Sequence, residues 1–140
     1  MRRVMTCGLP IAAWLVAVVT VTSAHGLPQG GWVLPATAQT DKNPLTVNAG
    51  TIAAGKKLFV STCQRCHGVT AKGDGPDGDD NTTADRDLTV ASRAKSNPDG
   101  VVFYKIWNGR ESPKMPAQKD ELSKEQVWAI VAYVQTLRAK

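Results

Sequence analysis

Apolar residues return every three or four positions near the end of the chain, in its clearest periodic stretch. The members of this stripe are Val127, Ile130, Val131, Val134 and Leu137. Such spacing puts them on one face of a helix. Just ahead of the stripe, Ser123 can cap a helix and Gln126 can complete a capping box. The pattern predicts a core helix that begins after Ser123.

Residues 97–107 carry a second set of helix signals. Asn97 can act as the cap, and Pro98 suits the first helical position. Asn108 and Gly109 then supply a stop. We expect a helix that ends at this stop.

A third helix is predicted to begin near Asn48 or Thr51 and to lead into a pair of cysteines. Leu58 and Phe59 belong to its apolar face. Gly55 lies in its middle at a cost of about 1 kcal/mol in helix propensity. A glycine at this point suggests that another helix crosses closely there.

Residues 25–47 show neither a helical nor an alternating period and are rich in glycine and proline. Such composition predicts an extended, loosely held N-terminal arm. Its one apolar stretch, residues 32–34, is expected to make a single local contact; covering part of the domain or touching a partner is the alternative.

The stretch from Gly68 to Asp87 is predicted to be a loop. Four aspartates lie between Asp74 and Asp80. A solvated acidic turn is the expected interpretation, because runs of charge are usually solvated. Calcium binding is the alternative, although the order of the carboxylates does not match an EF-hand loop.

Residues 1–24 carry the signals of a secretory leader: a positive start, an apolar run and small residues before Ala24. The apolar run is shorter than the roughly 20 residues that a membrane-spanning helix needs. We therefore expect a signal peptide that is cleaved after Ala24, with membrane anchoring as the less favoured alternative.

Length and charge limit the remaining possibilities. The 140 residues allow one domain, and 17 basic against 12 acidic residues give a formal net charge of +5. Loss of Arg2 and Arg3 with the leader would leave 15 basic residues and a charge of +3. Basic and aromatic residues do not cluster, so nucleic-acid binding is not expected. Because Cys7 lies in the leader, a disulfide scaffold is not expected either.

The two remaining cysteines form the sequence Cys63-Gln64-Arg65-Cys66-His67. C-x-x-C-H is the attachment signature of c-type haem. Cysteines three residues apart lie on one side of a helical turn, so both thiols can reach the vinyl groups on one porphyrin edge. His67 leaves from the same side and is predicted to bind the iron. A thioredoxin-like redox pair and a zinc site are the alternatives.

Met115 is the candidate for the opposite face of the haem. It lies between Pro113 and Pro116 in a segment that cannot be helical. A thioether held by a stiff loop suits the sixth position of haem iron, and methionine with histidine is a standard axial pair. Filling a gap in the core is the alternative for Met115, and His25 is a weaker candidate for the same position.

These motifs together make residues 48–140 resemble a class I c-type cytochrome of the small, single-haem bacterial periplasmic kind. The resemblance implies an all-α fold of three to five short helices wrapped around one covalently bound haem c. It also implies that the first and last helices cross and that Leu88 lies against the haem. Pro76 is expected to assist His67, whose second ring nitrogen needs a carbonyl acceptor in the following loop. Trp107 or Arg110 is expected to bind a propionate.

A haem closed by His67 and Met115 exchanges single electrons and leaves no open position for a substrate, so an electron-transfer protein rather than an enzyme is predicted. The expected partners are redox proteins: a donor dehydrogenase or reductase and an acceptor oxidase or other cytochrome. The protein is expected to be a periplasmic monomer or a subunit of a complex. A bound electron-transfer subunit and a haem peroxidase-type enzyme are the alternatives. Basic residues near Met115 are equally compatible with partner docking and with a solvated face.

Overall fold

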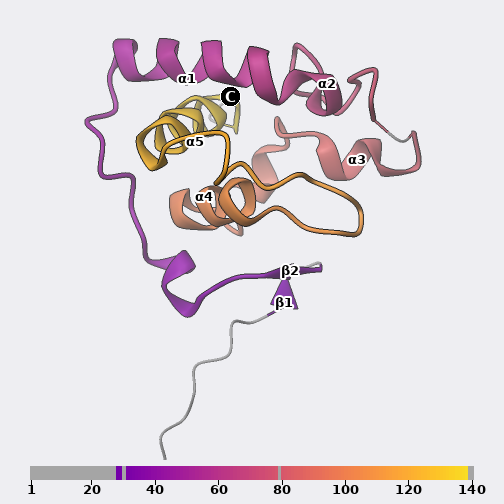
Figure 1. Ribbon diagram of the computed structural model, residues 1–140, viewed down its shortest axis with the longest axis horizontal. Helices are drawn as coiled ribbons and strands as arrows, with labels where there is room; N and C mark the ends of the chain where they lie inside the picture. The colour runs from indigo at the N-terminus through magenta and orange to yellow at the C-terminus, as the bar shows by residue number, and fades with distance from the viewer. Residues whose placement is uncertain (1–27, 30, 79, 139–140) are drawn as a thin grey trace, which may run out of the picture.

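The computed structural model describes residues 28–29, 31–78 and 80–138 (Figure 1). The predicted leader, its cleavage site and His25 lie outside the described residues. None of the helices in the described ranges has the length and apolar character needed to cross a bilayer.

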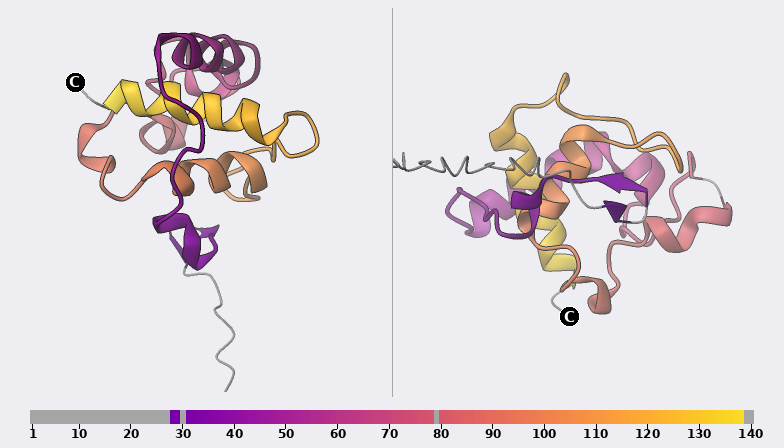
Figure 2. Two further views of the ribbon diagram at one scale, coloured as in Figure 1. Left: turned by 90° about the vertical axis from the view of Figure 1, so that its left-hand side faces the viewer. Right: turned by 90° about the horizontal axis from the view of Figure 1, so that it is seen from below.

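Four layers of secondary structure are stacked on one another. Helix α1 (Ala49–Thr62) packs on α5 (Lys124–Arg138), α5 packs on α4 (Asp99–Asn108), and the 3-10 helix η1 (Ala36–Gln39) packs on the far side of α4. Figure 2 shows this order in its left view. The layers bury one main core, which includes Phe59, Phe103, Ile106, Val127, Ile130 and Val131.

Short elements connect these layers. They are α2 (Gln64–His67), η2 (Asp80–Thr82), α3 (Thr83–Arg86) and η3 (Ala91–Arg93). The strands β1 (Pro28–Gln29) and β2 (Trp32–Val33) form a small antiparallel hairpin in which Gln29 faces Trp32. With five α-helices and this one hairpin across the described residues, the predicted all-α fold is confirmed.

The ends of the helices follow their capping residues. Asn48 accepts a hydrogen bond from the Thr51 amide at 3.0 Å, so α1 begins where the sequence predicts. At α5 the Ser123 amide donates to the Gln126 side chain at 2.8 Å, and the Gln126 amide donates back to Ser123 Oγ at 3.3 Å. The predicted capping box is therefore confirmed.

The predicted cap of α4 is wrong by one residue. Pro98 occupies the cap position with an extended backbone and no side-chain bond. Asn97 precedes this proline, which disfavours helical backbone at that residue. Its side chain instead donates to the Arg93 carbonyl at 2.9 Å and accepts from Lys105 Nζ at 2.7 Å.

The crossing predicted at Gly55 is confirmed. A Cβ at this position would overlap the carbonyl oxygen of Ala129 and would lie 3.1 Å from Cβ of Tyr133. Helices α1 and α5 therefore approach as closely as their backbones allow. The Phe59 and Tyr133 rings meet beside this point, with centroids 5.4 Å apart.

The prediction that residues 25–47 are loosely held is wrong for the part that the structure describes. We call residues 28–29 and 31–47 the strap. Trp32, Leu34 and Ala38 are buried and form a second core cluster with Val101 of α4. Their partners lie far along the chain, so local composition gave no sign of them. A further anchor is Asn43, whose side-chain amide donates to the Trp128 carbonyl at 2.9 Å.

Candidate functional site

Cys63, Cys66 and His67 lie on one helical turn at the end of α1. Cys63 both ends α1 and begins α2, and its carbonyl accepts from the amides of Cys66 at 3.2 Å and His67 at 3.0 Å. Both thiols are free and partly buried. All three side chains are therefore held on one short, hydrogen-bonded turn, residues 63–67, which we call the attachment turn.

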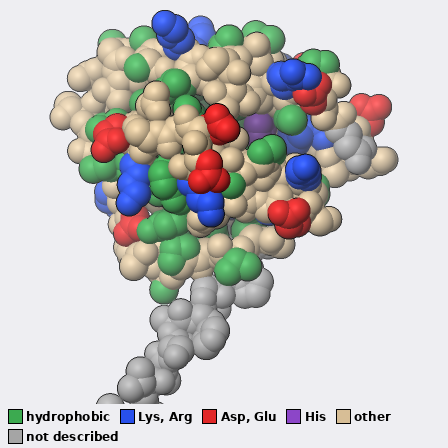
Figure 3. Space-filling model, viewed as in Figure 1, with side chains coloured by type: hydrophobic (Ala, Val, Ile, Leu, Met, Phe, Trp, Pro, Cys, Tyr) green, Lys and Arg blue, Asp and Glu red, His purple; other side chains and the backbone are tan. Residues whose placement is uncertain are grey.

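The His67 ring is fixed through its Nδ1 atom, which lies 2.8 Å from the Arg86 carbonyl oxygen. Since a carbonyl only accepts, Nδ1 carries the proton and Nε2 keeps its lone pair for a metal. Burial lowers the pKa of His67, which favours the neutral, ligating form. The Phe59 ring lies beside it at 6.3 Å between centroids. Figure 3 shows a small area of histidine surface on the face in view, next to hydrophobic side chains.

The sequence did not identify Arg86 as part of this site. Its guanidinium donates to the carbonyl of Cys66 at 3.1 Å and to that of Gly73 at 3.0 and 3.2 Å, and it also bonds the Thr82 hydroxyl. These bonds tie α3 to the attachment turn and hold the Arg86 carbonyl against His67. The two residues lie 19 positions apart, and no local pattern marks the pair.

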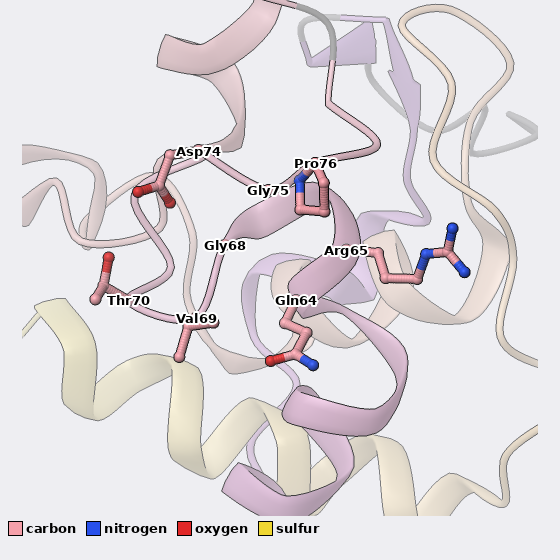
Figure 4. A pocket seen from close by; sticks show the side chains of 8 residues that line it. All are labelled: Gln64, Arg65, Gly68, Val69, Thr70, Asp74, Gly75 and Pro76. Carbon is pink, nitrogen blue, oxygen red and sulfur yellow. The ribbon is translucent and has the colours of Figure 1, made fainter.

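Pro76 is not the residue that supplies the carbonyl to His67, so its predicted role is corrected. It lines a cavity of about 290 Å³ together with Gln64, Arg65 and Asp74 (Figure 4). Beside it Arg65 pairs with Asp77 at 2.6 Å. The described residues contain no group of three or more His, Cys, Asp or Glu side chains arranged to hold a metal ion.

Met115 lies in an irregular segment, as predicted. We call residues 109–118 the ligand loop. This loop carries Met115, the predicted iron ligand. Within it a bridge joins Arg110 and Met115, whose amides each donate to the other residue's carbonyl at 2.9 Å. The Gln118 amide donates to the Ile106 carbonyl of α4 at 3.0 Å. Met115 is partly buried and packs against both core clusters.

The other three predicted cofactor residues lie at separate points around the core. The Leu88 amide donates to the Ala71 carbonyl at 2.8 Å, and its side chain packs on the main cluster. The Trp107 ring stacks on Phe103 with centroids 5.7 Å apart. The Arg110 guanidinium lies over the Trp32 ring instead of standing free. Contact between these residues and a haem remains a prediction.

The donor set fits covalent haem better than zinc. Burial, with a smaller contribution from neighbouring Cys66, raises the pKa of the Cys63 thiol to about 12. Structural zinc sites use four converging ligands, whereas the described residues bring no three such side chains together. A thioether is neutral and is compatible with the same surroundings. The partly buried apolar residues at the edge of the main core include Leu58, Leu88, Trp107 and Met115, which could cover an apolar ring.

Fold and site thus define a helical haem protein of the c type. The Cytochrome c family model matches residues 52–138, and the chain belongs to this family. The chemistry of the family is electron transfer through covalently bound haem c. The predicted class is therefore confirmed.

Similarity to solved structures agrees with this assignment. One chain of the reducing HAO-like protein complex of Kuenenia stuttgartiensis is 29% identical to this chain, with a TM-score of 0.55. The match covers 67% of this chain and 46% of that one, so this protein corresponds to less than half of the other chain's length. No curated protein matches.

Proposed function

We propose that the protein is an exported single-electron carrier with one haem c, joined to Cys63 and Cys66 and ligated by His67 and Met115. The observation that carries this proposal is the attachment turn. Both thiols are free on one turn, and the Nδ1–carbonyl bond leaves only Nε2 of His67 for iron. Few other chemistries need two cysteines at this spacing followed at once by a histidine.

Each part of the chain has a separate task in this proposal. The turn joins the cofactor to α1, and Arg86 fixes the orientation of the His67 ring. Met115 supplies a neutral sulfur from a loop closed by two backbone hydrogen bonds. When bound, haem c provides reversible one-electron exchange at its iron. The buried apolar residues around it exclude water, which disfavours the additional charge of the oxidised state.

The proposed compartment is the periplasm, and the proposed partners are other redox proteins. The leader signals in residues 1–24 support export. A donor dehydrogenase or reductase would deliver electrons, and an oxidase or another cytochrome would accept them. Because His67 and Met115 would both bind the iron, no ligand site would stay open for peroxide, and a peroxidase-type reaction is disfavoured.

A second candidate function is that of an electron-transfer subunit held in an oxidoreductase complex. The similarity to part of a longer chain in a multi-protein complex favours it. Size-exclusion chromatography of the native protein separates the two proposals. Elution at the size of a monomer supports the mobile carrier, whereas co-elution with other redox subunits supports the bound form.

Pyridine treatment of the purified protein tests the attachment. The proposal predicts one haem per chain that resists extraction by acidified organic solvent and gives a spectrum of two thioether bonds. The Cys66→Ala variant should give the shifted spectrum of one thioether bond. Haem that is fully extracted from the wild-type protein would overturn the proposal.

A further inference from the structure

The strap lies outside residues 52–138, which the family model matches, and is nevertheless built into the fold. Its η1 segment lies on the side of α4 opposite α5, and the residues after η1 run back across α4 and α5 toward α1 (Figure 2). The Gly100 amide of α4 donates to the Asp41 carbonyl at 3.1 Å. A Cβ at Gly100 would lie 2.6 Å from the Ala38 carbonyl oxygen, so strap and helix are in direct backbone contact.

Trp32 is the strap residue that reaches toward the ligand loop. It is only 9% exposed, whereas its neighbour Val33 is 79% exposed. Two cations lie over its ring: the Arg110 guanidinium at 4.4 Å from the ring centroid and Lys105 Nζ at 5.3 Å. Both distances are within the range of cation–π attraction, and such contacts are stronger when they are shielded from water.

Arg110 transmits this contact to the ligand loop. Its backbone forms both hydrogen bonds of the bridge with Met115. Its side chain donates from Nε to the Pro113 carbonyl at 2.8 Å. Met115 also packs against the cluster that contains Trp32. One arginine therefore joins the strap, the bend of the loop and the predicted ligand.

We propose that Trp32 is a positioning residue for Met115. The indole holds the Arg110 side chain, and Arg110 holds the loop in the conformation that presents the Met115 thioether. This inference rests on the proposed function in so far as Met115 is taken to be the iron ligand. The bracing of the loop itself does not depend on ligation.

The alternative is that Trp32 contributes only apolar burial to the fold. In that case its removal would destabilise the whole protein without a local effect on the loop. Leu34 provides the matched comparison, because it is 4% exposed and belongs to the same cluster. Val33→Ala is the control for a change on the exposed side of the same strand.

Hydrogen exchange of the holoprotein tests whether Trp32 and Arg110 brace the ligand loop, and it does so without reference to ligation. The Met115 amide donates within the bridge, so its exchange reports the opening of the loop. We expect Trp32→Ala to accelerate this exchange about tenfold relative to the Ile130 amide in α5, and Trp32→Phe to accelerate it about threefold. Val33→Ala and Leu34→Ala should leave the ratio unchanged. Equal ratios in Trp32→Ala and Leu34→Ala would overturn the inference.

Competition by imidazole for ferric iron tests the consequence for the ligand. A loop that opens more often exposes the iron more often, so Trp32→Ala should bind imidazole about tenfold more tightly than wild type. Trp32→Phe keeps an aromatic ring, so its imidazole affinity should lie between those of the wild type and Trp32→Ala. It also serves as the test variant if Trp32→Ala does not fold. An unchanged imidazole affinity in both variants would contradict the brace while leaving the proposed function intact. Absence of sulfur-to-iron absorption in the wild-type protein would contradict the proposed function instead.

Discussion

The turn that carries His67 and the loop that carries Met115 differ in where their supports lie. The turn continues a helix, and its histidine is held by a carbonyl 19 residues away. The ligand loop has no helix of its own, and part of its support comes from the strap near the other end of the described chain. The comparison indicates that the cysteine–histidine turn is specified by nearby sequence, although the orientation of the His67 ring depends on Arg86. The loop that carries Met115 depends more on distant contacts, because the strap packs against it.

Removing both thiols should have the largest effect on the fold, because the haem can then no longer be attached. In a Cys63→Ala, Cys66→Ala chain the haem is not attached, and a domain of about 90 residues has little core to compensate for the lost apolar ring. We expect the far-ultraviolet circular dichroism signal of the helices to be largely lost. Ser61→Ala, a change at an exposed residue of the same helix, should keep it. Native helicity in the double variant would show that the polypeptide core suffices.

A methyl group at the crossing of α1 and α5 should destabilise the packing of α1, the helix that leads into the turn with His67. In Gly55→Ala the new Cβ overlaps the backbone of Ala129, which cannot yield as a flexible side chain would. We expect the free energy of unfolding to fall by about 3 kcal/mol, measured by denaturant titration of the holoprotein. The control is Gly50→Ala in the first turn of the same helix, where the nearest atom is Asn48 Oδ1 at 3.2 Å. It should change stability by no more than about 1 kcal/mol.

The corresponding change on the methionine side is Gly109→Ala. Gly109 has φ +63°, and a Cβ there would overlap the Met115 carbonyl and lie 2.5 Å from the Ala117 amide nitrogen. We expect a loss of about 2 kcal/mol in unfolding free energy. Unlike Gly55→Ala, this variant should also bind imidazole more tightly, because the loop is distorted. Equal imidazole affinity in both variants would remove the distinction between the two sides.

A smaller effect is expected from Lys105, a residue of α4 whose ammonium group lies over the Trp32 ring of the strap. Burial, together with the nearby charges of Arg138, Arg110 and Arg93, lowers its pKa from 10.5 to about 8. Between these values the folded protein binds fewer protons than the unfolded chain, so stability should rise as the pH rises from 8 to 10.5. Below about pH 8 the cost of the buried charge is fully present.

Lys105→Gln removes this charge and keeps a donor for Asn97. The unfolding free energy of the variant should therefore depend less on pH across the same window than that of the wild-type protein. Lys95→Gln, at an exposed position, is the control and should follow the wild-type curve. Identical pH dependence in Lys105→Gln and the wild type would show that Lys105 is not penalised in the folded state.

The same contrast explains how much of the molecule could be predicted from the sequence. The α5 stripe, its capping box, the start of α1 near Asn48 and the Gly55 crossing are all encoded within a few residues, and the sequence predicts each of them correctly. The attachment turn is likewise a local motif. These features depend on helix periodicity and capping, which operate over one or two turns.

The features that escaped prediction depend on contacts between distant segments. Trp32 finds its partners in α4 and the ligand loop, and Arg86 reaches His67 from another short helix. The strap did carry one weak signal, the apolar stretch of residues 32–34. The alternative interpretation of this stretch, that it covers part of the domain, is the one that the structure supports. Pro76 was favoured as the partner of His67 because it was near in sequence, whereas the hydrogen-bond acceptor lies further along the chain.

The ferric absorption spectrum of the wild-type protein and of Met115→Ala tests the central claim most directly. If His67 and Met115 close the two faces of one covalent haem, the wild type shows sulfur-to-iron charge-transfer absorption and the variant lacks it, while both keep the covalent haem. A wild-type spectrum without this absorption, or its persistence in Met115→Ala, would contradict the account.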